Sequence, residues 1–413
     1  MRLYSNQYSY FNHSISLILA LSPILQTYGW GPFDFSFIGI IIIFLWGTIF
    51  NTSSRTPIPT YLNIYLWYYL FTFIVGGISV GNIELPLGWM KIFLTFWIFF
   101  NYVKIGIFCR YYIFISYISI GYFLIQYVLW EYFGIHISGI IDQIPLTLDM
   151  DEYDYRRFIN SEGTRLCSFF SEPALFAQYL LPLSVLTIFN KGDKNKYIKC
   201  AIILATFLLL KSGNAIFILS IVIACYIIHS LMQTFSLKRL AGVIAIFVLI
   251  SFGSIYYSQS EIGESLIERQ SEFEVSETYT SGFLRVYRGY YVYESLDIWE
   301  QIFGANNTVL MENAIRHCKI PYLFGDQDYY FNTVQNILIK TGIVGAILFV
   351  IFLVGTFRKA NPVGKTIMIG LTILSFIASM YLSYIMLLYL IFSVKLTKIR
   401  NEKGRYINYS YRH

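Results

Sequence analysis

The sequence predicts an all-helical protein that crosses a membrane many times, with about twelve transmembrane helices. Of the 413 residues, 56% are hydrophobic and only 13% are charged, and the mean hydropathy is +0.57. Soluble domains carry about 25% charged residues, so half that share leaves too little polar surface to cover a water-soluble particle. Runs without a charged residue, such as 61–80 and 366–394, reach the length of about 20 residues that a bilayer crossing needs.

The whole chain, 1–413, is expected to form one integral membrane domain. Its last two apolar segments are separated by so little polar sequence that one long tilted helix, and therefore eleven crossings, is the alternative. We place the crossings near residues 14–30, 35–50, 61–80, 88–108, 111–131, 173–190, 198–211, 214–233, 240–257, 333–357, 365–379 and 381–395.

Basic residues orient these helices, because Lys and Arg gather on the cytoplasmic side of membrane proteins. This places both termini in the cytoplasm and makes the long polar segments 131–172 and 258–330 two large extracytoplasmic loops. The net charge of +6 reflects this anchoring and gives no reason to expect a nucleic acid. One side of the layout collects Arg55, Arg110, the lysines within 191–199, Lys238, Arg239, Arg358, Lys359 and Lys365.

The first candidate site opens the sixth predicted crossing. Glu172 and Pro173 stand at its start, and Arg165 lies seven residues earlier. Proline suits a first helical turn and a carboxylate is stabilised by the positive end of a helix, so Glu172 serves as a cap in one interpretation. In the other interpretation Glu172, at the boundary between water and lipid, binds or deprotonates a sugar hydroxyl.

The second candidate site lies in the second loop. Arg285 and Arg288 are three residues apart and share one face of a helix. Guanidinium groups match phosphate oxygens, and the aromatic rings around them would stack on sugars. An interfacial helix that uses Arg and Tyr as membrane anchors is the alternative. The surrounding rings are Tyr287, Tyr290, Tyr291 and Tyr293.

The third candidate site is the start of a long apolar segment. Residues 329–357 exceed the length of one crossing. If the crossing begins near Thr341, the preceding residues, among them Tyr329 and Asn332, line a cavity in the outer leaflet. Lys340 then either faces this cavity or reaches the lipid headgroups.

No metal or other cofactor is expected. The five cysteines form no CxxC motif or Cys/His cluster. The acidic run 149–154 lacks the glycine and the ligand spacing of a calcium loop. No serine stands in a GxSxG elbow, so a serine nucleophile has no support either.

These motifs resemble the Wzy-type O-antigen and capsule repeat-unit polymerases of the O-antigen ligase-like superfamily. That family has an Arg, then an aromatic-rich stretch that ends in Glu-Pro-Ser and Phe-Ala-x-Tyr at the start of a crossing. Here Arg165 precedes Phe169-Phe-Ser-Glu-Pro-Ala-Leu-Phe-Ala-Gln-Tyr179, with Ala174 where the family has Ser. A later Gly-x-x-Gly crossing is matched by Gly342 and Gly345.

The resemblance implies a metal-independent, inverting glycosyltransferase of the GT-C-like class in the bacterial inner (plasma) membrane. It would polymerise oligosaccharide repeat units linked to undecaprenyl pyrophosphate, at the periplasmic face, into O-antigen or capsular polysaccharide. Its partners would be the lipid-linked oligosaccharide, membrane lipids, a chain-length regulator and a flippase. The implied catalytic residues are Glu172, Arg165, Arg285 and Arg288, and the implied substrate-binding residues are Tyr179, Tyr290, Tyr329, Asn332 and Lys340.

Three other classes remain as alternatives. O-antigen ligases share the architecture but place His-Asn eleven residues before the first glycine of the Gly-x-x-Gly crossing, where this chain has Phe331-Asn332. A lipid-oligosaccharide flippase or other transporter would carry ionisable groups near the bilayer midplane, whereas these crossings are nearly free of charge. A membrane acyltransferase would need a His-centred motif near the membrane, and none is evident.

Overall fold

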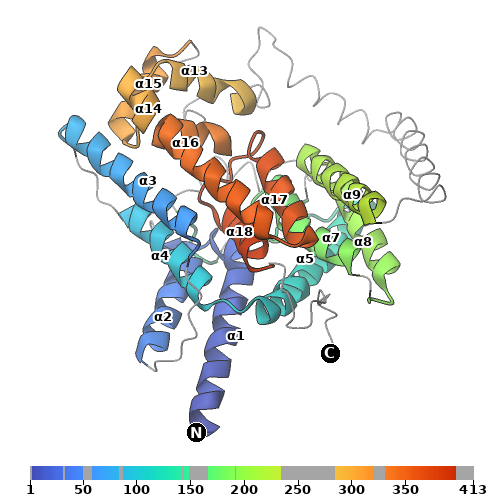
Figure 1. Ribbon diagram of the computed structural model, residues 1–413. Helices are drawn as coiled ribbons and strands as arrows, with labels where there is room; N and C mark the ends of the chain where they lie inside the picture. Colours follow the sequence, from blue (N-terminus) through green and yellow to red (C-terminus); the bar gives the residue numbers. More distant parts are fainter. Residues whose placement is uncertain are drawn as a thin grey trace.

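The computed structural model describes residues 2–30, 33–49, 58–82, 87–141, 143–147, 166–190, 192–233, 284–319 and 331–396, and it is predominantly helical (Figure 1). Within this described part, four helices are long and apolar enough to cross a membrane. The prediction of a helical, membrane-embedded chain is therefore confirmed. The four helices are α3 (Thr60–Ser79), α5 (Ile105–Phe133), α9 (Gly213–Gln233) and α16 (Thr333–Lys359).

Other helices, most of them shorter, lie in the remaining predicted crossings, except for 240–257, which lies outside the described residues. Some predicted boundaries were wrong: α1 ends at Leu25, before the end of the segment 14–30, and the segment 88–108 is interrupted after residue 102, where α4 ends and α5 soon begins. The number of crossings stays a prediction. These other helices are α1 (Arg2–Leu25), α2 (Phe35–Ile49), α4 (Leu87–Tyr102), α7 (Pro173–Phe189), α8 (Lys196–Leu209), α17 (Pro362–Leu374) and α18 (Tyr384–Lys395).

Helices α17 and α18 form a hairpin inside the bundle. With 13 and 12 residues, they extend about 20 and 18 Å, less than the roughly 30 Å of a bilayer core. The backbone amide of Asn361, before α17, donates to the carbonyl of Leu396, after α18, at 2.8 Å. At the hairpin tip the carbonyl of Ala378 accepts from the amide of Thr333, at the start of α16, at 3.0 Å. The tip therefore meets the beginning of α16.

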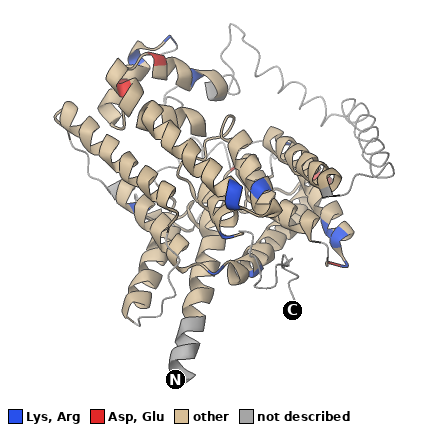
Figure 2. Cartoon of the chain, in the orientation of Figure 1, with Lys and Arg blue, Asp and Glu red and all other residues tan. Residues whose placement is uncertain are grey.

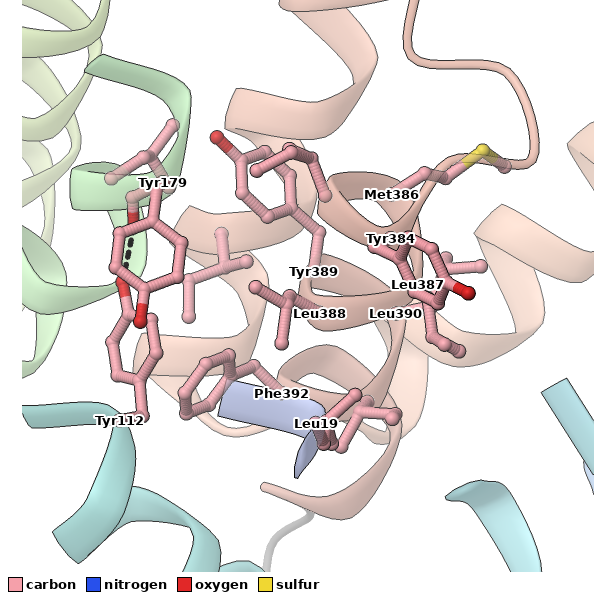
Figure 3. Packing of buried hydrophobic residues seen from close by; sticks show 14 of the residues in the cluster. Leu19, Tyr112, Tyr179, Tyr384, Met386, Leu387, Leu388, Tyr389, Leu390 and Phe392 are labelled. Atoms are coloured by element: carbon pink, nitrogen blue, oxygen red, sulfur yellow. Dashed lines mark hydrogen bonds between the residues drawn. The ribbon is translucent and has the colours of Figure 1, made fainter. Parts of the chain in front are cut away.

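Helix α18 is the centre of the core. Every residue from Tyr384 to Ser393 is buried, as expected of a helix that is apolar all round. It packs against α1, α7, α16 and α17. Figure 3 shows Leu388, Tyr389 and Phe392 of α18 beside tyrosines of neighbouring helices.

Two tyrosine hydroxyls form hydrogen bonds with backbone groups of α7 that an internal proline leaves without helical partners. Pro182 has no N–H, so the carbonyl of Gln178 loses its helical donor. The hydroxyl of Tyr389 replaces that donor at 2.6 Å. The hydroxyl of Tyr112 donates to the carbonyl of Tyr179 (Figure 3) and accepts from the amide that follows the proline at 3.1 Å. Backbone groups in a membrane must find partners inside the protein, and these two hydroxyls provide them.

Part of the predicted second loop is a folded unit, the α13–α15 unit. It comprises the π-helical turn η1 (Leu284–Arg288), α13 (Gly289–Glu294), α14 (Ile298–Phe303) and α15 (Thr308–His317). The unit has its own small core and lies beside the end of α3 and the start of α16 (Figure 1).

Helix α16 breaks where this unit docks. Gly342 has φ 63° and ψ −171°, and the carbonyl of Ile339 accepts from the amide of Ala305 at 2.7 Å. A Cβ atom at position 342 would lie 2.4 Å from the carbonyl oxygen of Ile302. The break lies next to Thr341, the start considered for this crossing in the third candidate site.

Helices α3 and α16 run antiparallel. Tyr61 lies near Gly355, and Tyr68 lies near Gly345, so the end of α3 and the start of α16 share one end of the bundle with the α13–α15 unit. Charge bias assigns this end to the extracytoplasmic side. Figure 2 shows basic residues where α16 meets α17 and near the start of α8, and mixed charges on α14 and α15.

Candidate functional site

A pocket of about 400 Å³ opens between the turn after α1, the first half of α4 and the tip of the α17–α18 hairpin. Its wall surface is mostly apolar and also carries hydroxyl, amide and charged side chains. Apart from Thr95, which is in the middle of α4, the polar ones lie near helix ends, or in connections, that the sequence assigns to the extracytoplasmic side. The polar residues of the wall are Gln26, Thr27, Asp34, Lys91, Thr95, Thr147, Ser171, Ser383 and Tyr384.

A buried ion pair forms part of the wall. Asp34 ends the short strand β2 (Phe33–Asp34), which pairs with β1 (Gly29–Trp30). Asp34 is 2% exposed, and its Oδ2 lies 2.5 Å from Nζ of Lys91. Oδ1 accepts hydrogen bonds from the hydroxyl of Tyr384 and the amide of Phe37, each at 2.8 Å. A carboxylate at this depth needs a cation and donors, and it has both.

Glu172 is exposed and does not line this pocket, although it follows the wall residue Ser171 in the chain. It is the residue before α7, and its side chain makes no capping hydrogen bond. The carboxylate is therefore not engaged in capping the helix. Glu172 has extended backbone (φ −144°, ψ 149°), and successive side chains of an extended backbone point to opposite sides, so the position of Ser171 in the wall does not place this carboxylate in the pocket. Arg165, its expected partner, lies outside the described residues.

The segment before Glu172 is fixed to α5. Ser168 adopts φ 58°, its amide donates to Oε1 of Gln126 at 2.9 Å, and its hydroxyl donates to the carbonyl of Ser119 at 2.7 Å. The ring of Phe169 stacks on that of Tyr122 with 4.3 Å between the centroids. These contacts hold the start of α7, and therefore the backbone of Glu172, in a defined place.

Tyr179 is fully buried within the bundle. Its hydroxyl donates to the carbonyl of Ala20 at 2.9 Å, and its ring lies 5.1 Å from that of Tyr112. This expected substrate-binding residue therefore joins α7 to α1 and α5 in the structure.

The second candidate site belongs to the α13–α15 unit and lies apart from the residues that line the pocket. Arg288 is fully buried, so its guanidinium is not exposed on the surface of the protein. Gly289, the next residue, packs against Gln335 of α16. Tyr290 is half-buried, and burial raises the pKa of its hydroxyl, which stays protonated at neutral pH. Only the backbone of Arg285 belongs to the described part.

The third candidate site surrounds the start of α16. Asn332 is 1% exposed, and its side chain caps α16 by accepting from the amide of Gln335 at 2.9 Å. Lys340 is half-buried, with Nζ 5.8 Å from the ring centre of Tyr381, a cation–π distance. Residue 382, next along the chain, lines the pocket. Lys340 and the pocket therefore flank the same hairpin tip. Tyr329 lies outside the described residues.

The sequence analysis did not select Asp34 or Lys91. Two signals were present: Asp34 is the first acidic residue in the chain, and Lys91 is one of two lysines inside the predicted crossing 88–108. Ionisable residues within membrane segments indicate functional sites when a partner is available. The sequence does not show that these two residues form an ion pair, because they come together only in the folded protein.

Among the described residues, no three His, Cys, Asp or Glu side chains come together in a group that could hold a metal ion. No protein-family model matches the chain, and the curated proteins contain no sequence similar to it at a significant level. The function is therefore argued from the motifs and from the pocket.

Proposed function

We propose that this chain is a polymerase of lipid-linked oligosaccharide repeat units, with a GT-C-like arrangement of about twelve crossings. The observation that carries the proposal is the exposed carboxylate of Glu172 at the start of α7, which makes no capping hydrogen bond and follows Ser171 of the pocket wall, at a helix end that the predicted topology assigns to the extracytoplasmic side. A substrate tethered to a membrane lipid requires a polar site at this level of a largely apolar helical bundle.

The chemistry is the displacement of a pyrophosphate leaving group. A hydroxyl oxygen of the acceptor repeat unit attacks the anomeric carbon of the donor chain. The new C–O bond forms as the bond to undecaprenyl pyrophosphate breaks, and the anomeric configuration inverts. Glu172 receives the hydroxyl proton, as a general base must lie within reach of the proton it removes. Arg165, Arg285 and Arg288 stabilise the negative charge of the departing pyrophosphate.

The buried position of Arg288 adds a condition to this mechanism. Because Arg288 is fully buried, a pyrophosphate reaches its guanidinium only when the side chains that cover it move aside.

A gene deletion tests this function in the native host. The deletion strain is complemented with wild type, Arg285→Ala or Glu172→Gln, and its surface polysaccharide is separated on a gel. Glu131→Gln is a matched control, because Glu131 is an exposed carboxylate near the end of α5. We expect core plus one repeat unit without a ladder in the deletion strain, and a ladder with wild type and Glu131→Gln only.

The same gel discriminates the alternatives. Loss of even the single capped unit in the deletion strain would refute polymerisation. Accumulation of lipid-linked polymer in the membrane would then identify a ligase, and its absence would favour a flippase.

A further inference from the structure

We infer that α14 anchors the α13–α15 unit in the membrane, by inserting its exposed apolar face into the lipid leaflet at this end of the bundle. The face consists of Ile298, Trp299 and Phe303, and its partner is the boundary between the headgroups and the acyl chains. The inference goes beyond the proposed function, because it concerns how the unit meets the membrane and not the reaction.

The exposed face of α14 is apolar throughout. Ile298, Trp299 and Phe303 are 64%, 69% and 40% exposed, and the rings of Trp299 and Phe303 stack with 5.9 Å between their centroids. Single exposed apolar residues are ordinary on protein surfaces, whereas a contiguous group of large ones marks contact with another protein or with a membrane.

The polar side chains of α14 are turned toward the unit instead. Glu300 and Gln301 are half-buried. The carboxylate of Glu300 accepts from the amide of Asp297 at 3.1 Å, and the side-chain amide of Gln301 donates to the carbonyl of Leu296 at 2.9 Å. A helix that faced water would present its polar residues outward and bury its apolar ones. The arrangement in α14 is the reverse.

The neighbouring helix α15 has the arrangement expected in water. Its residues Met311, Ala314 and Ile315 are buried in the small core of the unit, and every exposed residue of the helix is polar or charged. The unit therefore has one helix suited to lipid and one suited to water. The exposed residues of α15 are Thr308, Glu312, Asn313, Arg316 and His317.

Contacts with α3 place α14 at the level of lipid. The carbonyl of Phe303 accepts from the hydroxyl of Tyr68 at 3.1 Å, whereas Leu310 of α15 lies near Gly76, about 12 Å further along α3. Near its end α3 still exposes Ile78, by 63%. Helix α14 therefore meets α3 where α3 itself has an apolar exposed surface, and α15 lies closer to the end of α3.

The exposed apolar surface of α16 begins beside α14. The carbonyl of Ile302 lies against Gly342, and the next residue of α16, Ile343, is 46% exposed, followed one turn later by Ile347 at 54%. Helix α16 is long and apolar enough to cross a membrane, so lipid covers this surface. In Figure 1, α14 lies between α15 and the start of α16.

The size and chemistry of the face favour lipid over a protein partner. Stable protein interfaces take about 20–30 residues from each side, and α14 offers three exposed side chains. A tryptophan beside aliphatic residues, on a helix next to membrane-crossing helices, is typical of the boundary between headgroups and acyl chains. The anchor is also a different segment from the Arg- and Tyr-rich one that the sequence suggested, in which Arg288 is fully buried.

Tryptophan quenching tests this position. The full-length protein is placed in nanodiscs of phosphatidylcholine whose acyl chains carry bromine either near the headgroup or near the chain end. The emission of wild type minus that of Trp299→Phe gives the signal of Trp299, and phenylalanine keeps an aromatic ring at this exposed position, so the fold is preserved. We expect this signal to lose most of its intensity with bromine near the headgroup, less with bromine near the chain end, and little with iodide in the buffer.

Asn313→Trp, added to Trp299→Phe, is the matched control, because Asn313 is exposed on α15. Its added signal should fall strongly with iodide and little with brominated lipid. Iodide quenching of Trp299 as strong as that of the control would overturn the inference, because the face would then be open to water. Protection of Trp299 from both quenchers would also overturn it, since another protein surface would then cover the face. Neither measurement needs a substrate, so the anchor and the polymerase can fail independently.

Discussion

The break in α16 provides a direct test of how the end of the bundle beside the α13–α15 unit is built. Gly342 combines φ 63° with ψ −171°, a backbone region that is essentially restricted to glycine and costs other residues about 1–3 kcal/mol. In Gly342→Ala the new Cβ would also lie 2.4 Å from the carbonyl oxygen of Ile302 and 2.6 Å from the amide of Gly304. Relief of this clash would pull α14 away and weaken the hydrogen bond from Ala305 to Ile339, which is worth about 1 kcal/mol. Together these effects destabilise the protein by about 3 kcal/mol.

Gly355→Ala is the control in the same helix. Its Cβ would lie 3.6 Å from the ring of Tyr61, an ordinary contact, and alanine favours the helix by up to about 1 kcal/mol. Thermal unfolding of both variants, purified in one detergent and followed by tryptophan fluorescence, should show a lower midpoint for Gly342→Ala and an unchanged or higher one for Gly355→Ala. Equal midpoints would refute the assignment of Gly342 as a required break.

Three further predictions address the bundle and the pocket. Tyr112→Phe should destabilise the protein by about 2 kcal/mol, since it leaves backbone groups around Pro182 without partners; an unfolding midpoint equal to wild type would contradict this. Lys91→Met should destabilise the protein by about 2 kcal/mol, because it leaves the buried carboxylate of Asp34 without its cation; the cost is smaller than for a fully buried ion pair because Lys91 is partly exposed. Adding Asp34→Asn to this variant should restore part of the lost stability in the same melting assay. Gly88→Cys, at an exposed pocket position with open space around its Cβ, should react with a membrane-impermeant maleimide in intact cells above the background of wild type; labelling only after lysis would place the pocket on the cytoplasmic side.

The helices were predictable because charge-free apolar runs are bounded by charged or turn-forming residues. The run 61–80 became α3 at 60–79, and Glu172-Pro173 correctly marked the start of α7. The helical spacing expected in the aromatic part of the second loop is confirmed by α13 and α14. Apolar length alone did not reveal that the charge-free run 366–394 is divided into the two short helices α17 and α18.

The pocket was not predictable from local sequence. Asp34 and Lys91 are far apart in the chain, and Tyr384, the third member of their hydrogen-bond network, lies 350 residues from Asp34. Only the packing of α18 between α1 and α4 brings them together. In contrast, the position of Glu172 could be predicted, because proline and a carboxylate both favour a helix start.

Reconstitution tests the central claim most directly. The purified protein in liposomes receives a chemically defined repeat unit on undecaprenyl pyrophosphate, with a chelator present, and the lipid-linked products are analysed by mass spectrometry. The proposed function predicts products that grow by whole repeat units, with one undecaprenyl pyrophosphate released per addition, and no growth with Glu172→Gln. Unchanged substrate with wild-type protein, or growth that persists in Glu172→Gln, would contradict this account.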